Sequence, residues 1–236
     1  MDNFQGGTIH EYNYETNTIV NSFPTPEPVE GVFGDGLAYA PDRGTLFYTN
    51  AAGTKLIYEL DANTGAVLNS FDSGDATEGN VANATGLAYG DVIGIGGGVF
   101  VAGVDEGCML GIDPDAPGTV LDGFCFGAGY FPTSATIGAE LDGKSQWYVL
   151  SYYPAIDVWT ASPSPAFVDF FDTPEVDSEG ANFAGGLGQV TTPQPGGGDP
   201  VVRSYHSTVV TDSIYEYDAR IAGTGAIGRG ALGNRF

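Results

Sequence analysis

The sequence predicts an all-β fold made of repeated four-stranded units, and three observations carry this prediction. One hairpin-like segment recurs along the 236 residues, a second segment recurs between its copies, and no stretch has the apolar spacing of an amphipathic helix. Apolar residues alternate with polar ones or form short runs, which is typical of β-strands. Because self-similarity at a fixed spacing constrains a whole fold, the repeats carry most of the argument.

The first recurring segment predicts a series of β-hairpins. IHEYNYETNTIVNSF (9–23) recurs as IYELDANTGAVLNSF (57–71), an offset of 48 residues (57 − 9). A third copy, MLGIDPDAPGTVLDGF, covers 109–124, and weaker copies cover 156–171 and 214–227. Each copy places two strands around a turn with Asn, Asp, Gly or Pro, the residues that supply hairpin turn geometry.

The second recurring segment predicts two further strands in each unit. GLAYAPDRGTLFYTNAAG (36–53) is matched by GLAYGDVIGIGGGVFVAG (86–103), and weaker copies lie in 134–152 and 184–210. One complete unit therefore holds four short strands. Four-stranded units of this length are the blades of a β-propeller.

The order of the units predicts about five blades in one domain spanning residues 1–236. The expected parts are an outer hairpin at 8–23, blades at about 33–71, 83–125, 131–171 and 183–225, and a C-terminal tail at 220–236. We expect the ring to close by pairing of N- and C-terminal strands. Since the strand count falls one or two short, the tail after Asp218 must supply strands, or a neighbouring subunit completes the ring.

One blade carries a family resemblance. Residues 30–65, EGVFGDGLAYAPDRGTLFYTNAAGTKLIYELDANTG, resemble a blade of the group that includes SMP-30/gluconolactonase and NHL-repeat propellers. Blades of that group read as Gly-Leu-Ala, an Asp-x-x-Gly turn, an aromatic strand and then Asp-x-x-Thr-Gly. For the hydrolases of the group, the resemblance implies a divalent-metal site at the mouth of the central channel. Glu30 of the Glu30-Gly31 pair would supply its first ligand, but the Asn-Gly pair expected later does not occur.

The Glu-Gly pair recurs at Glu30, Glu78 and Glu179, each time before a predicted innermost strand. In a propeller these linkers lie on one face around the axis, so the three carboxylates would converge on a hard cation such as Ca²⁺. The alternative is a blade-entry turn with a solvated carboxylate, and the frequency of incidental motif matches favours it.

Two acidic loops offer the same pair of interpretations. Asp72 and Asp75 precede Glu78 in one loop, and Asp113 and Asp115 lie in the other. Neither loop has EF-hand spacing, and Asp is a common turn former because its carboxylate accepts hydrogen bonds from its own backbone. Turn formation is therefore favoured over calcium binding.

Cys108 and Cys125 are the two cysteines, and they lie symmetrically about the turn of the third hairpin. This placement favours a cross-strand disulfide, with two buried free thiols as the alternative. A disulfide would imply an oxidising or extracellular setting.

The charge excludes several partners. Thirty Asp and Glu face seven Lys and Arg, giving a net charge of −23, which is repelled by nucleic acids and anionic membranes. No stretch has the ~20 apolar residues that cross a bilayer, and the N-terminus does not resemble a signal peptide. Arg220, Arg229 and Arg235 gather in the tail, which would dock on its own acidic body or on a neighbouring subunit.

These features favour a non-enzymatic β-propeller, extracellular or on a cell or virion surface, that acts as a binding or structural module. The expected partners are proteins, including further copies of the chain, or carbohydrates stacked on aromatic side chains. No nucleophile elbow, phosphate-binding loop or zinc-protease motif occurs in the sequence. The alternative function is a metal-dependent lactonase-like hydrolase with a cation at the channel mouth.

Overall fold

The computed structural model describes most of the predicted strands. The described residues are 2–3, 7–13, 15–27, 36–50, 53–90, 97–103, 107–126, 132–139, 145–151, 155–160, 166–172, 184–192, 201–208, 213–218 and 232–234.

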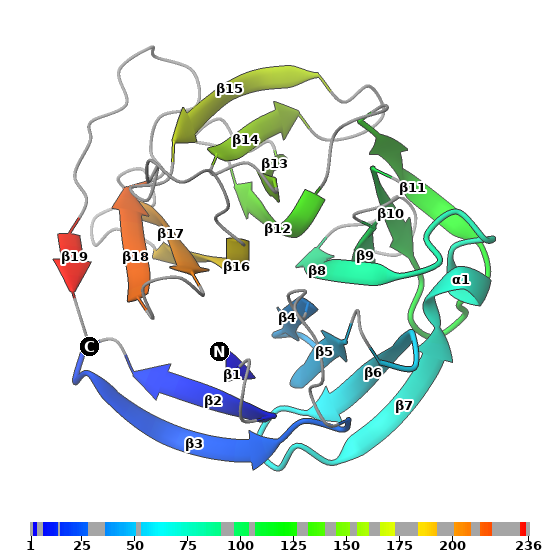
Figure 1. The fold of residues 1–236 in the computed structure, drawn as a ribbon, viewed down its shortest axis with the longest axis horizontal. Helices are drawn as coiled ribbons and strands as arrows, with labels where there is room; N and C mark the ends of the chain where they lie inside the picture. The colour runs from blue at the N-terminus through cyan, green and yellow to red at the C-terminus, as the bar shows by residue number, and fades with distance from the viewer. Residues whose placement is uncertain are drawn as a thin grey trace.

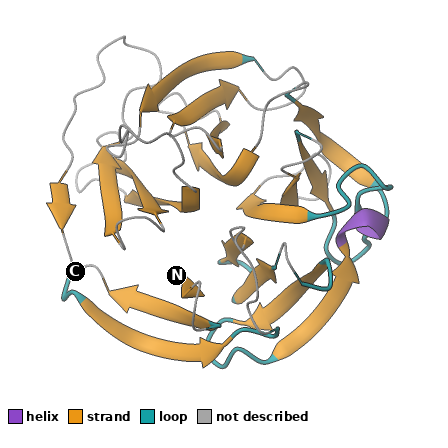
Figure 2. Ribbon diagram, viewed as in Figure 1, coloured by secondary structure: helices purple, strands orange, loops and turns teal. Residues whose placement is uncertain are grey.

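In these residues the strands form five sheets, and every pairing is antiparallel (Figure 2). The first sheet has the order β1 (Asp2–Asn3), β2 (Thr8–Asn13), β3 (Thr18–Pro24). The second has the order β4 (Gly36–Ala40), β5 (Thr45–Thr49), β6 (Leu56–Asp61), β7 (Val67–Asp72). The third has the order β8 (Ala84–Gly90), β9 (Gly98–Gly103), β10 (Cys108–Ile112), β11 (Val120–Cys125). The fourth has the order β12 (Pro132–Ala139), β13 (Ser145–Ser151), β14 (Ala155–Thr160), β15 (Phe167–Asp172). The fifth has the order β16 (Ala184–Thr192), β17 (Val201–Thr208), β18 (Ser213–Asp218), β19 (Leu232–Asn234).

The sheets lie around a common centre, as the blades of a β-propeller do (Figure 1). Strands β4, β8, β12 and β16 lie innermost, and each contacts the next along the chain, with a further contact between β16 and β4. Strands β3, β7, β11 and β15 follow the outer edge. The repeats therefore predicted the mainly antiparallel, four-stranded architecture correctly.

The two ends of the chain stay with their own sheets in the described residues. β1 pairs with β2, and β19 pairs with β18, so no described ladder joins the first sheet to the fifth. The tail does supply a strand, as predicted, but that strand extends the fifth sheet outward. Pairing with the preceding strand closes a shorter loop than pairing with the N-terminus, and shorter loops cost less entropy.

The outer hairpins share a turn in which an Asx side chain accepts backbone N–H groups. Asn13 Oδ1 accepts from the backbone N of Glu15 at 3.0 Å, and Asp61 Oδ1 accepts from that of Asn63 at 3.1 Å. These contacts are the reason that Asn and Asp recur at this position, because they fix the reversal that sets the strand register.

The described core fills the spaces between neighbouring sheets. The larger cluster joins the second and third sheets and includes Phe47, Ile57 and Leu87, each nearly or fully buried. A smaller cluster joins the first and second sheets through Ile9, Phe23, Tyr48 and Leu60. The short helix α1 (Ser73–Ala76) lies between β7 and β8, and the described residues include no helix long and apolar enough to span a membrane.

Candidate functional site

The outer edge of the molecule carries a β-bulge at the same repeat position in four sheets. In the outermost strand pair of each sheet the register shifts by one residue, which leaves one extra residue on the outer strand. The extra residues are all aliphatic: Val20, Leu68, Leu121 and Val168. A bulge places two residues of one strand opposite one residue of its partner and redirects the local side chains.

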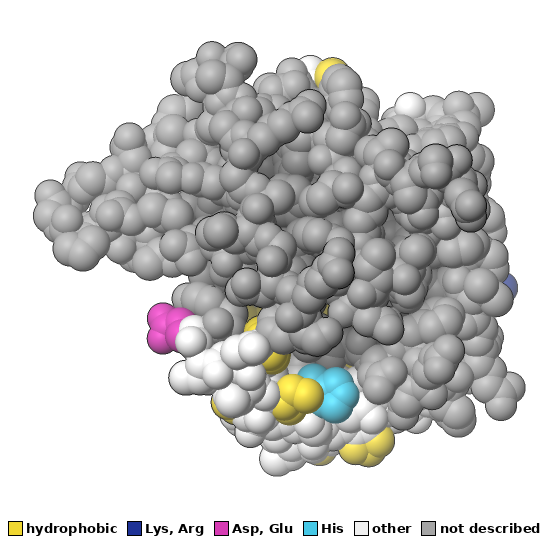
Figure 3. All heavy atoms as spheres, turned by 60° about the vertical axis from the view of Figure 1, so that its left-hand side comes forward, with side chains coloured by type: hydrophobic (Ala, Val, Ile, Leu, Met, Phe, Trp, Pro, Cys, Tyr) yellow, Lys and Arg dark blue, Asp and Glu magenta, His cyan; other side chains and the backbone are white. Residues whose placement is uncertain are grey.

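The described aliphatic residues at these bulges are exposed. Val20 is 55% exposed and Leu68 is 57% exposed, and each follows an equally exposed aliphatic residue, Ile19 or Val67. Leu121 is 36% exposed. In the fourth sheet Phe167, which precedes the bulge, is 51% exposed. We call these six residues the apolar edge sites: Ile19, Val20, Val67, Leu68, Leu121 and Phe167. Figure 3 brings the left-hand side of Figure 1 forward and shows hydrophobic side chains on the described surface beside a histidine.

After three of the bulges, the next side chain is polar and accepts a backbone N–H of the outer strand. Asn21 Oδ1 accepts from the backbone N of Ser22 at 2.8 Å, and Asn69 Oδ1 accepts from that of Ser70 at 2.8 Å. Asp122 Oδ1 makes the equivalent contact with the next residue, Gly123, at 2.8 Å. An N–H that already donates to a side chain is less available to a further strand, so the outer edge resists strand addition.

An ion-pair network holds the second and third sheets together. Arg43, in the β4–β5 turn, donates from Nε to Glu59 Oε1 at 2.8 Å and from Nη1 to Asp115 Oδ2 at 2.8 Å. Glu59 lies on β6 and is buried, and it also accepts from Thr45 Oγ1 at 3.0 Å. The hydrogen bonds with Asp115 and Glu59 raise the pKa of Arg43, and the same guanidinium lowers the pKa of Asp115.

Aromatic side chains extend this interface. Phe47 of β5 stacks on Tyr89 of β8, with ring centroids 5.9 Å apart. The Tyr89 hydroxyl donates to Asp42 Oδ2 at 3.0 Å. Burial and this hydrogen bond raise the pKa of Tyr89 to about 12. The interface is thus apolar inside, with charged and phenolic groups at one end.

A buried carboxylate lies at the interface between the first and second sheets. Glu27 follows β3, is 8% exposed, and accepts from the backbone N of Thr54 at 3.0 Å. The hydroxyls of Thr54 and Tyr58 also donate to it. Burial alone would raise the pKa of Glu27, but these hydrogen bonds outweigh burial and lower it. A Cβ at Gly53 would lie 2.0 Å from Glu27 Oε2, so a larger residue there would displace the carboxylate.

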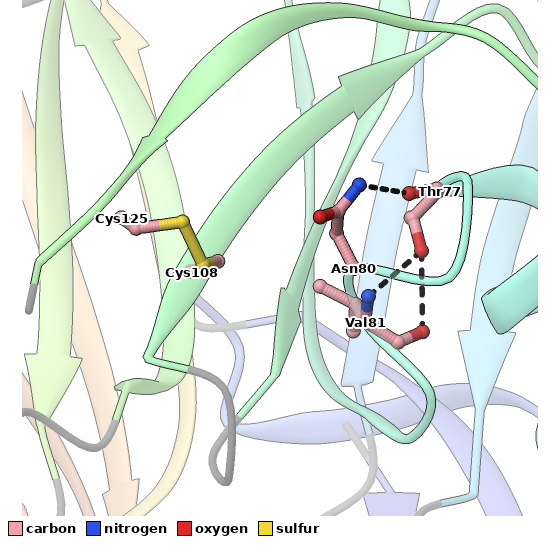
Figure 4. Close-up of a disulfide and its surroundings, with 5 residues drawn as sticks. All are labelled: Thr77, Asn80, Val81, Cys108 and Cys125. Carbon is pink, nitrogen blue, oxygen red and sulfur yellow. Dashed lines mark hydrogen bonds between the residues drawn. A yellow bond between two sulfur atoms is a disulfide. The ribbon is translucent and has the colours of Figure 1, made fainter. Parts of the chain in front are cut away.

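The two cysteines lie opposite each other in the register of β10 and β11 and are joined by a disulfide (Figure 4). Their Cα atoms are 4.0 Å apart, and the bond closes the open end of the third outer hairpin. In the same view, Thr77 Oγ1 accepts from the backbone N of Val81 at 2.9 Å and donates to its carbonyl oxygen, which fixes the linker into the third sheet.

One of the three predicted cation ligands is described, and it lies at the outer edge. Glu78 Oε1 accepts from the backbone N of Val120, the first residue of β11, at 3.1 Å. That position differs from the channel mouth expected for it, because α1 carries the linker along the outer strands before it turns inward. Glu30 and Glu179 lie outside the described residues, so their part in a cation site stays a prediction.

The acidic loops form turns in the described structure. Asp72 caps α1 by accepting from the backbone N of Asp75 at 3.0 Å, and Asp113 accepts from that of Asp115 at 2.9 Å. Within the described part of the chain, no three His, Cys, Asp or Glu side chains lie close enough together to hold a metal ion.

Sequence reasoning missed the bulges, the Arg43 network and the Glu27 contacts. The bulge has a visible signal, two consecutive apolar residues followed by Asn or Asp in IVN, VLN, VLD and FVD. The other two arrangements have none, because each joins residues that are far apart in the sequence and do not recur.

No protein-family model matches this chain, and no curated protein matches it in sequence. Solved structures similar to it include BBS1N in complex with ARL6DN, with 12% identity and a TM-score of 0.46. The match covers 96% of this chain and 62% of the BBS1N chain. Raptor from Chaetomium thermophilum is 13% identical with a TM-score of 0.47, covering 91% of this chain and 18% of that one. A putative 6-phosphogluconolactonase from Bacteroides uniformis is 16% identical with a TM-score of 0.44, covering 89% and 59%. The chain thus spans less than two thirds of each of these proteins, and at such low similarity no activity or partner is transferred.

Proposed function

We propose that this chain is a single, non-enzymatic β-propeller domain that binds proteins as a surface or extracellular module. The observation that carries the proposal is the recurrence of exposed aliphatic side chains at one repeat position along the outer edge. Single exposed apolar residues are ordinary on protein surfaces. Here they occur as consecutive pairs in two sheets and recur at the same repeat position in others.

Two further features support the surface or extracellular setting. A disulfide between Cys108 and Cys125 persists in oxidising compartments and is rare in reducing ones. The net charge of −23 favours the solubility of a protein with exposed apolar residues.

The experiment that tests the non-enzymatic proposal is a hydrolysis assay with lactones and phosphoesters, run with Ca²⁺ and with EDTA. We expect no turnover in either condition. Turnover that EDTA abolishes would favour the metal-dependent lactonase-like alternative, in which Glu30 is a ligand. Glu30→Gln should then abolish both metal binding and turnover.

A second candidate function is self-assembly, favoured by the first sheet. Among the described residues this sheet has three strands, whereas each of the other four sheets has four. We propose a ring of five blades in which the first blade is completed either by the chain itself or by a strand from a neighbouring subunit. Sedimentation of the full chain beside a chain that lacks residues 1–23 tests this. Equal oligomeric states, each a monomer, would exclude assembly through the first sheet.

A further inference from the structure

We propose that the apolar edge sites dock a cationic protein partner through its aliphatic side chains, without adding a strand to the sheet. This inference rests on the proposed function as a protein-binding module and assigns to it a surface and a class of partner.

The outer strands β3 and β7 display consecutive aliphatic side chains to solvent. Consecutive residues of a regular strand point to opposite faces, so a half-buried strand shows its apolar residues alternately. The start of β7 shows no such alternation: Val67 and Leu68 are 52% and 57% exposed, and Asn69 and Ser70 after the bulge are exposed as well. Ile19 and Val20 repeat the arrangement in the first sheet. Each pair presents a small apolar patch to solvent at the start of an outer strand.

The backbone of the outer strands limits how a partner can bind at these sites. Directly after the bulges, Asn21, Asn69 and Asp122 occupy the next backbone N–H of their own strands. Because a bulge also interrupts the regular spacing of edge hydrogen-bonding groups, a partner strand finds neither a regular nor a vacant ladder there. The contact is therefore made by side chains.

Carboxylates near the apolar edge sites favour a cationic partner. Glu11 lies opposite Asn21 in the register and is exposed, and Glu78 lies beside the start of β11. Both ion pairs in the described residues use Arg43, so neither of them involves Glu11 or Glu78. A second copy of the chain carries the same charge of −23, so it lacks the charge complementarity that the carboxylates beside these sites favour. A partner with Lys or Arg around aliphatic residues complements both the charge and the apolar patches.

The sites recur in four of the five sheets, on the outer strands β3, β7, β11 and β15 (Figure 1). One extended partner can therefore contact several of them together. Linked contacts of this kind multiply their affinities, since each binding event raises the local concentration for the next.

The test uses the intact chain and a labelled, disordered peptide of mixed Lys, Leu and Gly, with binding followed by fluorescence anisotropy at low salt. The edge variant combines Val20→Ser, Leu68→Ser and Leu121→Ser. The matched control is Tyr39→Ser, which removes a residue that is 56% exposed on the innermost strand β4. We expect the edge variant to bind about tenfold more weakly or worse, the loss of about 1.4 kcal/mol, and the control to bind like the wild type. Circular dichroism confirms that both variants fold.

A second peptide, with Ser in place of every Leu, separates the apolar contribution from the charge. If it binds as tightly as the first, or if the edge variant binds like the wild type, the assignment of the edge sites is wrong while protein binding as such stands. If neither peptide binds the wild type, the cationic partner class is wrong. Asn69→Ala should leave the affinity unchanged, and tighter binding with new β-sheet signal would instead indicate strand addition.

Discussion

At the interface between the second and third sheets, the buried carboxylate of Glu59 faces a guanidinium. At the interface between the first and second sheets, the buried carboxylate of Glu27 accepts hydrogen bonds from an amide and two hydroxyls. Both carboxylates are less than a tenth exposed, but one is neutralised and the other is solvated by neutral donors. The chain has seven basic residues, and it uses one of them, Arg43, to pair with Glu59, while Glu27 is stabilised without a cation.

The difference indicates how each interface responds to change. An ion pair fails when its cation is removed, because a buried charge is then left without a partner. A carboxylate held by neutral donors tolerates loss of its own charge better, since the donors can hydrogen-bond an amide or find water.

The largest effect is expected for Arg43→Met. It removes the partner of Glu59 and separates Asp115 from the second sheet, so the free energy of unfolding should fall by about 3–5 kcal/mol. Urea denaturation measures the loss. Arg43→Lys keeps the charge without the two-pronged geometry and should cost less. A double variant with Glu59→Met should recover part of the stability, and no recovery would mean that the buried charge is not the cause.

A smaller loss is expected for Glu27→Gln. The amide keeps the shape of the carboxylate but accepts weaker hydrogen bonds, so unfolding should become about 1.5–3 kcal/mol easier at neutral pH. Glu11→Gln, on an exposed residue of β2, is the matched control and should change little. Equal stability of Glu27→Gln and the wild type would show that the contacts of Glu27 contribute nothing.

The same substitution predicts a pH dependence. The pKa of Glu27 is lowered by folding from an ordinary value of 4.5, so its contribution is present above that pH. It is lost as the pH falls below 4.5 and through the lowered pKa, because the unfolded chain takes up the proton first. The difference in unfolding free energy between the wild type and Glu27→Gln should therefore shrink from pH 6 to pH 3. A constant difference would show that the charge of Glu27 does not stabilise the fold.

The smallest effect is expected for Asn21→Ala at the first interface. It removes the hydrogen bond from Asn21 Nδ2 to the Asn63 carbonyl, 2.8 Å long, which joins β3 to the β6–β7 turn. Thermal unfolding should show a loss of about 0.5–1.5 kcal/mol. Asn69→Ala removes the equivalent residue of the second sheet and should cost less if the contact between sheets is what matters.

The repeats in the sequence predicted the architecture because each hairpin is local. A turn such as Asp61 to Gly65 and the strands beside it are encoded within a few residues of one another. The contacts between sheets are different. Arg43 and Asp115 are 72 residues apart, and nothing in either segment specifies the other.

Glu78 shows a second limit of prediction from sequence, because a recurring motif did not indicate where the residue lies. Its Glu-Gly pair matched two others in the chain, but the neighbouring Asp72 caps a short helix that holds the linker at the outer edge. The sequence shows the consecutive aliphatic residues of the edge sites, whereas their exposure is seen only in the folded chain.

The disulfide has a consequence for proteolysis. The exposed loop at residues 115–119 lies between Cys108 and Cys125, as does the whole turn of that hairpin. A protease that cuts this loop produces two fragments that stay covalently joined, with β11 still beside β10. On a denaturing gel the nicked protein would run as one band without reductant and as two bands with it. Its third sheet would also stay intact after a cut that would separate the strands of a hairpin without a disulfide.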